Sequence, residues 1–441
     1  MIISARKLTV LLVIGALTPW LSAAEWKSHV VRQLGGTDGE VHIPARLQIV
    51  TEEINSVVLV PYLVYMPEKD RLLMLVTFQP GPTPAFHAMV ITSEDHGTTW
   101  SEPAVVQRGA DGAPTNGLGL SLSYLGQGEL LLHLGDPGVR MFSRDYGANW
   151  GNPVPVQPTP EGKPFHVWDP LLVEYDDQSA AVTRLLETGW TIVQPPDKSP
   201  SCEQAYLRSS ADKGRTWSEC TRVPQWQHVS EVALLRTATG DLLAACRSSI
   251  PPRFAGETVD HHEGLGISVS KDGGHTWSAV KKLYDWGRHH PSLVLMPGGD
   301  VVMTYVVRMG YVDTPEGYPQ FGIEAVVSHD HGQTWDLDHR YLLHRWEATM
   351  KGFNALYQSP QGVSSVLLPD GKMLTAFGTG YRSQGPGAGK HRRDIALVRW
   401  QLGEETLNDS STMRDAPPAS ALRNFFDPVT GKPAAKQRNQ E

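Results

Sequence analysis

The stretch Ser270-Lys271-Asp272-Gly273-Gly274-His275-Thr276-Trp277 decides the fold, because the chain repeats its pattern four more times. The pattern is Ser-x-Asp-x-Gly-x-Thr-Trp, with small departures, and the other copies occupy residues 93–100, 143–150, 210–217 and 328–335. Successive copies start 50 to 67 residues apart, which is typical of a four-stranded unit with its loops. The spacing therefore predicts a protein built from repeated small β-sheets.

The residue types of this motif suit a structural role. An Asp carboxylate such as that of Asp272 accepts hydrogen bonds from nearby backbone N–H groups and holds a tight turn. Gly274 supplies a positive φ angle, and Trp277 offers a large apolar surface that packs against a sheet. We therefore expect the five motif aspartates to hold turns and not to act in catalysis.

The sequence between the motifs is typical of strands. In one unit, apolar runs at residues 231–235 and 242–247 flank a turn, and a third run at 264–269 leads into the motif. This order indicates a four-stranded meander. Such units begin near residues 57, 118, 167, 229, 291 and 363. The prediction is therefore an all-β, six-bladed β-propeller of four-stranded antiparallel blades, in which residues 26–32 complete the last blade and close the ring.

Composition and the N-terminal residues indicate an exported globular protein. The chain has 441 residues and a formal net charge of -8, and the absence of a basic stripe argues against nucleic-acid binding. Arg6 and Lys7 precede an apolar run that is too short for a membrane span, and small residues follow at 22–24. We predict a signal peptide over 1–24, the propeller over 25–402 and a polar tail over 403–441. The mature protein is expected to be secreted or periplasmic, with no membrane span after cleavage.

The three cysteines leave two interpretations open. Cys202 and Cys220 lie on either side of the third motif copy, so a cross-strand disulfide and two free thiols both fit the sequence. Cys246 is expected to be a small buried side chain. No tight metal-ligand spacing is present in the sequence, and we predict neither a metal nor a cofactor.

With five motifs on predicted blades, the chain resembles the sialidase (neuraminidase) superfamily, in which the motif is the Asp box. The resemblance covers roughly residues 57–400. It implies arginines that bind a substrate carboxylate, a Tyr nucleophile paired with a Glu, and an Asp acid/base. Glu231 matches the position of that Glu, and Arg247 and Arg308 match two of the arginines. A pair of guanidinium groups binds a carboxylate in a bidentate way that Lys cannot reproduce.

Three parts of the family's set do not match. The first arginine belongs to an Arg-Ile-Pro triplet, and the triplets at residues 42–44 and 59–61 hold no arginine. Val363 stands at the position of the nucleophilic Tyr. The loop at 79–87, where the acid/base Asp would lie, has no carboxylate, and His87 is its only titratable side chain. The motifs therefore indicate the fold more strongly than the reaction.

Other side chains are candidates for the missing parts, because the inner strands of a propeller converge on its axis. His166, His228 and His289 each precede an inner strand, where imidazoles suit acid/base chemistry, less readily bind a metal, or serve as ordinary rim residues. Asp169 is a candidate catalytic carboxylate, or a turn residue before Pro170. The loop at 261–263 (His-His-Glu) adds further titratable groups. The catalytic candidates are Glu231, Asp169, His87, His166 and His228, and the substrate-binding candidates are Arg247, Arg308, Trp168, Arg288 and His289.

These features predict a secreted sialidase-like glycoside hydrolase that acts on terminal, acidic sugars with a non-standard catalytic set. The expected partner is a glycan or acidic oligosaccharide. Two alternatives stay open at this point. One is a glycan-binding propeller without catalysis, and the other is a sugar lyase that uses His and Arg chemistry.

Overall fold

The computed structural model describes residues 25–35, 39–54, 57–79, 85–115, 117–135, 138–176, 178–179, 181–195, 200–254, 259–381 and 393–403. The predicted signal peptide, and the predicted tail beyond its first residue, lie outside the described residues. No helix in the described ranges is long and apolar enough to cross a membrane.

Four separate sheets are four-stranded antiparallel meanders. The first comprises β3 (Val57–Met66), β4 (Arg71–Gln79), β5 (His87–Ser93) and β6 (Ala104–Val105). The second comprises β7 (Leu118–Gly126), β8 (Glu129–Gly135), β9 (Val139–Ser143) and β10 (Val154–Pro155). The third comprises β11 (Leu172–Tyr175), β12 (Val182–Val193), β13 (Cys202–Ser210) and β14 (Thr221–Gln227). The fourth comprises β15 (Val229–Arg236), β16 (Leu242–Ser248), β17 (Gly264–Ser270) and β18 (Lys281–Tyr284).

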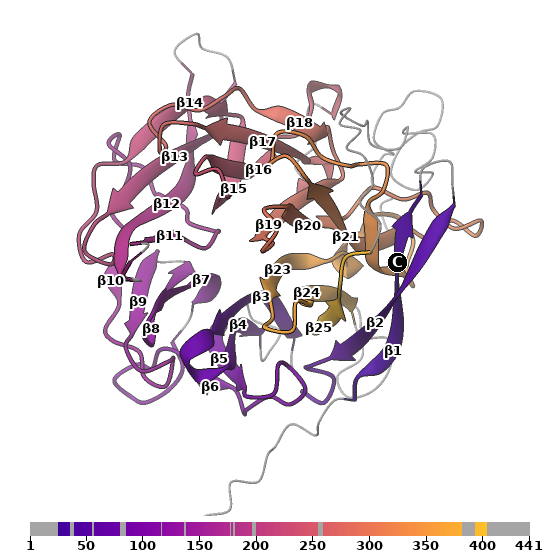
Figure 1. The fold of residues 1–441 in the computed structure, drawn as a ribbon, viewed down its shortest axis with the longest axis horizontal. Coiled ribbons are helices and arrows are strands. Elements are labelled where there is room, and N and C mark those ends of the chain that lie inside the picture. The colour runs from indigo at the N-terminus through magenta and orange to yellow at the C-terminus, as the bar shows by residue number, and fades with distance from the viewer. Residues whose placement is uncertain are drawn as a thin grey trace, which may run out of the picture.

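The fifth sheet has nine strands in the order β19-β20-β21-β22-β1-β2-β25-β24-β23. Its strands, in that order, are Arg288–Leu295, Val301–Val307, Gln320–Ser328, Tyr341–Glu347, Lys27–Leu34, Glu40–Ile49, Arg393–Trp400, Met373–Tyr381 and Gln361–Leu367. Short 3-10 helices η1 (Pro67–Lys69), η2 (Pro252–Phe254), η3 (Asp260–His262) and η4 (Gly352–Gln358) lie in the connections. Figure 1 shows the sheets arranged in a ring around a central axis.

The all-β propeller with four-stranded antiparallel blades is confirmed, but the prediction of six separate blades is wrong. The described strands form four such blades and the nine-stranded sheet. The cause is β1, which pairs with β2 on one side and with β22 on the other, where Arg32 faces Leu342. The strand expected at 26–32 is therefore present, but it bridges two groups of strands, and it is β2 that lies against β25.

The Asp boxes are turns held by side chains, as the motif predicted. In the fourth copy, Asp272 Oδ1 accepts hydrogen bonds from Ser270 Oγ (2.8 Å) and from Thr276 N (2.8 Å). Thr276 Oγ1 donates to Asp272 Oδ2 over 2.6 Å. Gly274 has a φ of 97°, which a residue with a Cβ rarely adopts, and its carbonyl accepts the indole N–H of Trp277. The aspartate is fully engaged in its turn.

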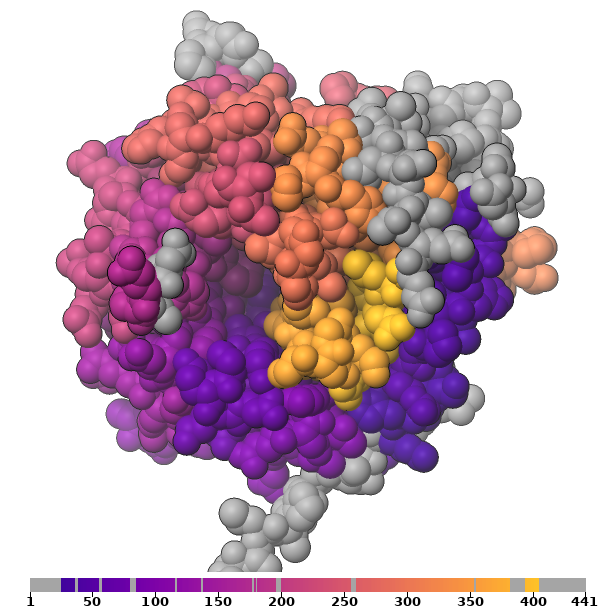
Figure 2. Space-filling view, in the orientation of Figure 1, coloured from indigo at the N-terminus to yellow at the C-terminus, as the bar shows by residue number. Residues whose placement is uncertain are grey.

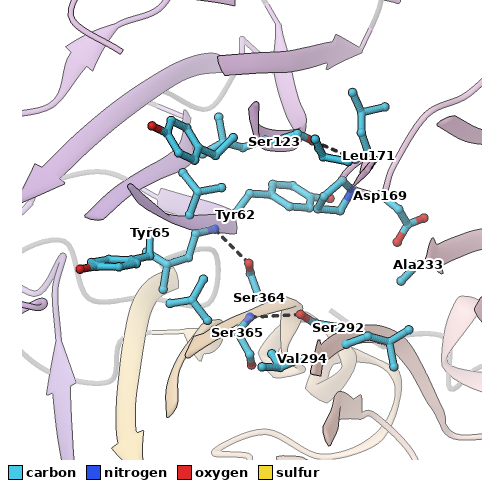
Figure 3. A pocket seen from close by; sticks show the side chains of 18 of the residues that line it. Tyr62, Tyr65, Ser123, Asp169, Leu171, Ala233, Ser292, Val294, Ser364 and Ser365 are labelled. Carbon is cyan, nitrogen blue, oxygen red and sulfur yellow. Dashed lines mark hydrogen bonds between the residues drawn. The ribbon is translucent and has the colours of Figure 1, made fainter. Parts of the chain in front are cut away.

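Strands β3, β7, β11, β15, β19 and β23 are the innermost ones, and each lies next to its neighbours around the ring. An innermost strand has one edge without a strand partner, so its N–H groups need other acceptors. Side chains of the adjacent strand supply them: Ser364 Oγ accepts from Leu63 N (2.9 Å), and Ser123 Oγ accepts from Leu171 N (2.8 Å). Figure 3 marks these bonds with dashed lines. Most of these positions use a hydroxyl group, whereas Val232 N donates to a carboxylate oxygen of Asp169.

Several innermost strands also carry a β-bulge near the start of the strand. The register shifts between Leu59 and Tyr62 in β3 and between His289 and Ser292 in β19. Within these bulges Val60 has a φ of 46° and His290 a φ of 58°, which is unusual for residues with a Cβ. Bulges turn side chains out of the regular alternation, so they aim residues at this rim toward the axis.

All three cysteines are buried free thiols. Of the two interpretations that the sequence left open for Cys202 and Cys220, the structure has the one without a disulfide. Burial raises the pKa of the Cys220 thiol to about 12, so this thiol is uncharged and unreactive at neutral pH.

Candidate functional site

A cavity of about 860 Å³ follows the axis of the ring between the innermost strands. Figure 2 shows a hollow at the centre of the ring, on the face of the molecule that is turned to the viewer. One end of the cavity is lined by Trp168, Asp169 and His290, and the other by Tyr65 and Tyr124. The first end lies at the bulged rim, where the titratable groups gather. It is therefore the candidate active site.

Two arginines approach a single carboxylate beside this end of the cavity. Arg247 comes from β16, and Arg308 directly follows β20. Arg308 Nη1 donates to Oδ2 of Asp260, and Arg247 Nη2 lies 3.8 Å from the same oxygen. Two strand ends of neighbouring units thus hold their guanidinium groups at one point, which is an arrangement suited to carboxylate binding.

Acidic side chains surround Arg247. Its Nη1 donates to Glu231 Oε1 over 2.6 Å, and its Nε donates to Glu263. Burial raises the pKa of Glu263 to about 7, although the charge of Arg247 opposes this shift. Glu231 is buried on β15, and its Oε2 lies 3.2 Å from His290 Nδ1. The cluster thus contains carboxyl groups in different environments.

Asp169 is the exception among the side chains that accept from innermost strands. Its Oδ2 accepts a hydrogen bond from Val232 N over 2.8 Å, the role that serine hydroxyls fill elsewhere. A carboxyl group brings a second oxygen to the cavity wall, where Figure 3 shows Asp169. Burial, with the negative charge of Glu231, raises the pKa of Asp169 well above its ordinary value. Asp169 is thus placed to carry a proton next to Glu231.

The adjacent histidines are neutral at neutral pH. His289 is 0% exposed, and neither ring nitrogen has a hydrogen-bond partner among the described residues. Its ring stacks on that of His290 at 5.9 Å. Burial lowers the pKa of both rings, with Arg308 and Arg247 adding to the effect. Neither ring therefore carries a proton to donate at neutral pH.

The structure brings some predicted site residues together and leaves others apart. Glu231, Asp169, Arg247, Arg308 and His289 belong to the cluster, and Trp168 lines the cavity with its ring 6.2 Å from that of His290. Two of the remaining candidates make local contacts. His166 is exposed against Trp190, and His87 Nδ1 lies 3.1 Å from the carbonyl oxygen of Thr115. His228 is exposed at a φ of 64°.

Arg288, a predicted substrate-binding residue, does not line the cavity. Its Nε donates to Glu324 Oε2 over 3.0 Å, and both side chains are buried within the nine-stranded sheet. The guanidinium also lies 4.5 Å from the ring of Tyr284. Arg288 therefore has a role in packing, because side chains alternate along a strand and its neighbour His289 takes the face toward the cluster.

Three residues of this region were missed in the sequence. Asp260 directly precedes the titratable run at 261–263, which was the available signal. Tyr62 follows the triplet at 59–61, and its hydroxyl donates to the Trp168 carbonyl over 2.7 Å. Arg393 donates twice to the carbonyl of Tyr357, and burial, with Arg308, lowers the pKa of Arg393 to about 10. Nothing in the sequence pointed to Arg393.

The arrangement supports two kinds of chemistry. The Arg247 and Arg308 guanidiniums can bind a carboxylate, and a protonated Asp169 beside the Glu231 carboxylate can act as an acid/base pair. Burial raises the pKa of Tyr62 well above its ordinary value, with Asp169 and Glu231 contributing. The Tyr62 hydroxyl is thus a neutral phenol and a weak nucleophile. Within the described residues, no group of three or more His, Cys, Asp or Glu side chains is arranged to hold a metal ion.

Comparisons with known proteins agree with this architecture. The family model described as "BNR repeat-like domain" matches residues 133–427. No curated protein matches the chain significantly. Among solved structures, a protein of unknown function from Dyadobacter fermentans is 17% identical, with a TM-score of 0.57 over 80% of this chain and 98% of that chain.

Two sialidases are among the similar structures. The Hadza microbial sialidase Hz136 is 14% identical, with a TM-score of 0.52 over 80% of this chain and 66% of that chain. A Trypanosoma rangeli sialidase in complex with sialic acid is 12% identical, with a TM-score of 0.50 over 85% of this chain and 57% of that chain. At these identities the likeness concerns the fold alone.

Proposed function

The chain belongs to the BNR repeat-like domain family and is a sialidase-like BNR repeat protein, and on that premise we propose that it is a glycoside hydrolase acting on terminal acidic sugars of glycans. One observation carries the proposal: Arg247 and Arg308 converge on the same carboxylate oxygen beside the axial cavity. A sugar that bears a carboxylate fits this pair, and the cavity holds the rest of the ring.

The proposed chemistry uses Asp169 and Glu231. The Asp169 carboxyl group accepts a hydrogen bond from Val232 N, the amide that directly follows Glu231 in the chain, so it lies close to Glu231. Glu231 in turn accepts a hydrogen bond from Arg247 Nη1. Protonated Asp169 gives its proton to the glycosidic oxygen as the C–O bond breaks. Glu231 takes a proton from the water whose oxygen attacks the anomeric carbon. Exchange with solvent then restores both groups. This scheme needs no tyrosyl intermediate at Val363.

Incubation with a panel of acidic and neutral oligosaccharides tests the proposal, with products identified by mass. Products that have gained one water support a hydrolase, and failure to process the acidic members overturns the preference for acidic sugars. An unsaturated product identifies a lyase, and bound but unchanged glycan identifies a binding protein. Either of these outcomes overturns the hydrolase proposal.

Binding of an acidic sugar should weaken by about 10- to 150-fold in Arg308→Ala, because a charge-assisted hydrogen bond contributes about 1.5–3 kcal/mol. Isothermal titration calorimetry with N-acetylneuraminic acid measures the change. Arg399→Ala is the matched control, because Arg399 pairs with Asp370 on the surface. Unchanged affinity in Arg308→Ala would place the carboxylate site elsewhere.

We also propose that the protein is secreted or periplasmic and loses residues 1–24. The proposal rests on the basic pair Arg6-Lys7 and the short apolar run that follows. The mass of the protein recovered outside the cytoplasm should correspond to a chain that starts at Glu25. Recovery only as the uncleaved chain in the cytoplasm would contradict it.

A further inference from the structure

Asp260 occupies the position between the arginines that a ligand carboxylate would take. Its Oδ2 is the oxygen that Arg308 Nη1 and Arg247 Nη2 approach. Its Oδ1 lies 2.8 Å from His261 Nδ1, and His261 Nε2 lies 2.9 Å from Ser359 Oγ. Ser359 is fully buried, so its hydroxyl group is not an accessible nucleophile. The chain of contacts from Ser359 through His261 instead orients Asp260.

The two arginines differ in what they would retain without Asp260. Arg247 also contacts Glu231 and Glu263. Within the described part of the chain, Arg308 has Asp260 as its only acidic partner, and its Nε donates to the Pro360 carbonyl over 3.0 Å. A buried guanidinium without a counter-charge is unfavourable. Arg308 therefore requires a carboxylate, either that of Asp260 or that of a ligand.

We propose that Asp260 is an internal carboxylate that occupies the arginine pair, must be displaced by the carboxylate of an acidic ligand, and thereby sets how strongly such a ligand binds. This inference rests on the proposed binding of acidic sugars. One carboxylate then replaces another, so the charge of the arginine pair stays balanced during the exchange.

The position of Asp260 at the surface makes the exchange feasible. Its side chain is 38% exposed, whereas that of Arg308 is 4% exposed and lies behind it. Asp260 begins η3, a single 3-10 turn closed by the bond from Glu263 N to the Asp260 carbonyl over 3.1 Å. Beside the arginines, His289 is buried with two ring nitrogens that lack a partner among the described residues. These nitrogens are a donor and an acceptor that no described residue uses.

The internal carboxylate sets a threshold for binding. Ligands bind only to molecules in which Asp260 has left the arginines, so the apparent affinity is reduced to that fraction of the intrinsic affinity. If such molecules make up about 1–10% of the population, the apparent Kd is raised about 10- to 100-fold. A small carboxylate makes no further contacts that offset this loss of affinity, whereas a sugar also contacts the cavity. The affinities of both ligands fall by the same factor, and only a ligand with these further contacts still binds at low concentration.

Asp260→Ala tests the inference, because it should bind N-acetylneuraminic acid and acetate at least about 10-fold more tightly than the wild type. Galactose, which has no carboxylate, should show no gain. Calorimetric titrations measure the affinities, and Asp260→Asn, which keeps the side-chain volume, should show a gain in the same direction. Asp285→Ala is the matched control, since Asp285 pairs with Arg253 (2.6 Å) and Lys282 (2.9 Å) at the surface.

The outcomes separate this inference from the proposed function. If the wild type binds N-acetylneuraminic acid and Asp260→Ala binds it equally or more weakly, Asp260 only positions the arginines and the inference fails alone. An equal gain for galactose would likewise overturn it. If neither protein binds any acidic sugar while both remain folded by circular dichroism, the proposed function fails and the inference fails with it.

Discussion

Asp169→Asn and Glu231→Gln should each lower the rate of glycan hydrolysis by about 10²- to 10⁴-fold, the usual contribution of a positioned general acid or base. Asparagine keeps a carbonyl oxygen that can accept from Val232 N, so Asp169→Asn preserves the structural bond and removes the proton. Glutamine likewise keeps the size of Glu231 while removing its ability to take a proton from water. kcat/KM on the best substrate of the oligosaccharide panel measures both losses.

The pH profile separates a catalytic Asp169 from a structural one. Burial and Glu231 raise the pKa of Asp169, so its acid form is present below that pKa and is lost as the pH rises through it. The wild-type rate should therefore fall on the alkaline side, and the residual activity of Asp169→Asn should lack this fall. Ser123→Ala is the control for the structural role, because Ser123 makes the equivalent bond to Leu171 N. A loss in Ser123→Ala as large as in Asp169→Asn would assign Asp169 to packing.

Glu187→Ala should destabilise the protein by about 3–5 kcal/mol, because removing one partner of a buried ion pair leaves unpaired charges. Glu187 Oε2 accepts from Arg140 Nη2 over 2.7 Å, and Arg208 Nε donates to the same oxygen. His133 Nε2 lies 2.7 Å from Oε1, and all these side chains are buried. Although burial acts to raise it, the pKa of Glu187 is held well below its ordinary value by His133, Arg140 and Arg208.

Urea unfolding at pH 7 measures this loss. Glu94→Ala is the control, because Glu94 pairs with Arg71 at a side-chain exposure of 72%, and such surface pairs contribute about 0–1 kcal/mol.

Ser121, His133 and Glu187 also form a line of contacts resembling a catalytic triad, with Ser121 Oγ 2.7 Å from His133 Nδ1. All three are buried, and Ser121 does not line the axial cavity. Ser121→Ala should therefore leave the hydrolytic rate unchanged, and a rate loss there would contradict the structural assignment.

The features that depend on local sequence were predictable. The Asp boxes gave the propeller architecture, because each box closes its turn with its own side chains. Glu231, Arg247 and Arg308 could be found because their places follow from the order of strands within a unit. The position of Arg288 was not predictable, because the alternation of side chains along β19 directs it to Glu324 and not toward the axis.

The features that depend on contacts between distant segments could not be predicted. Asp260 meets Arg308 only because η3 folds over the rim, and Arg393, the first residue of β25, reaches Tyr357 of η4. The bridging role of β1 follows from its pairing with β22, at the far end of the chain. His289 and His290 are uncharged because of burial, which the sequence does not reveal.

The placement of β1 and β2 between strands from the end of the chain has a consequence for biosynthesis. Among the described strands these two leave the ribosome first, whereas their partners β22 and β25 leave only after all four separate blades. A lone hairpin is marginally stable in water, and the apolar side chains of Val31, Ile43 and Ala45 pack with Val363 and Trp400 only in the finished sheet. Such long-range pairing slows folding. Any nascent or truncated chain that stops short of Trp400 therefore carries an unpaired β-edge, which makes it a substrate for chaperones, proteases or aggregation.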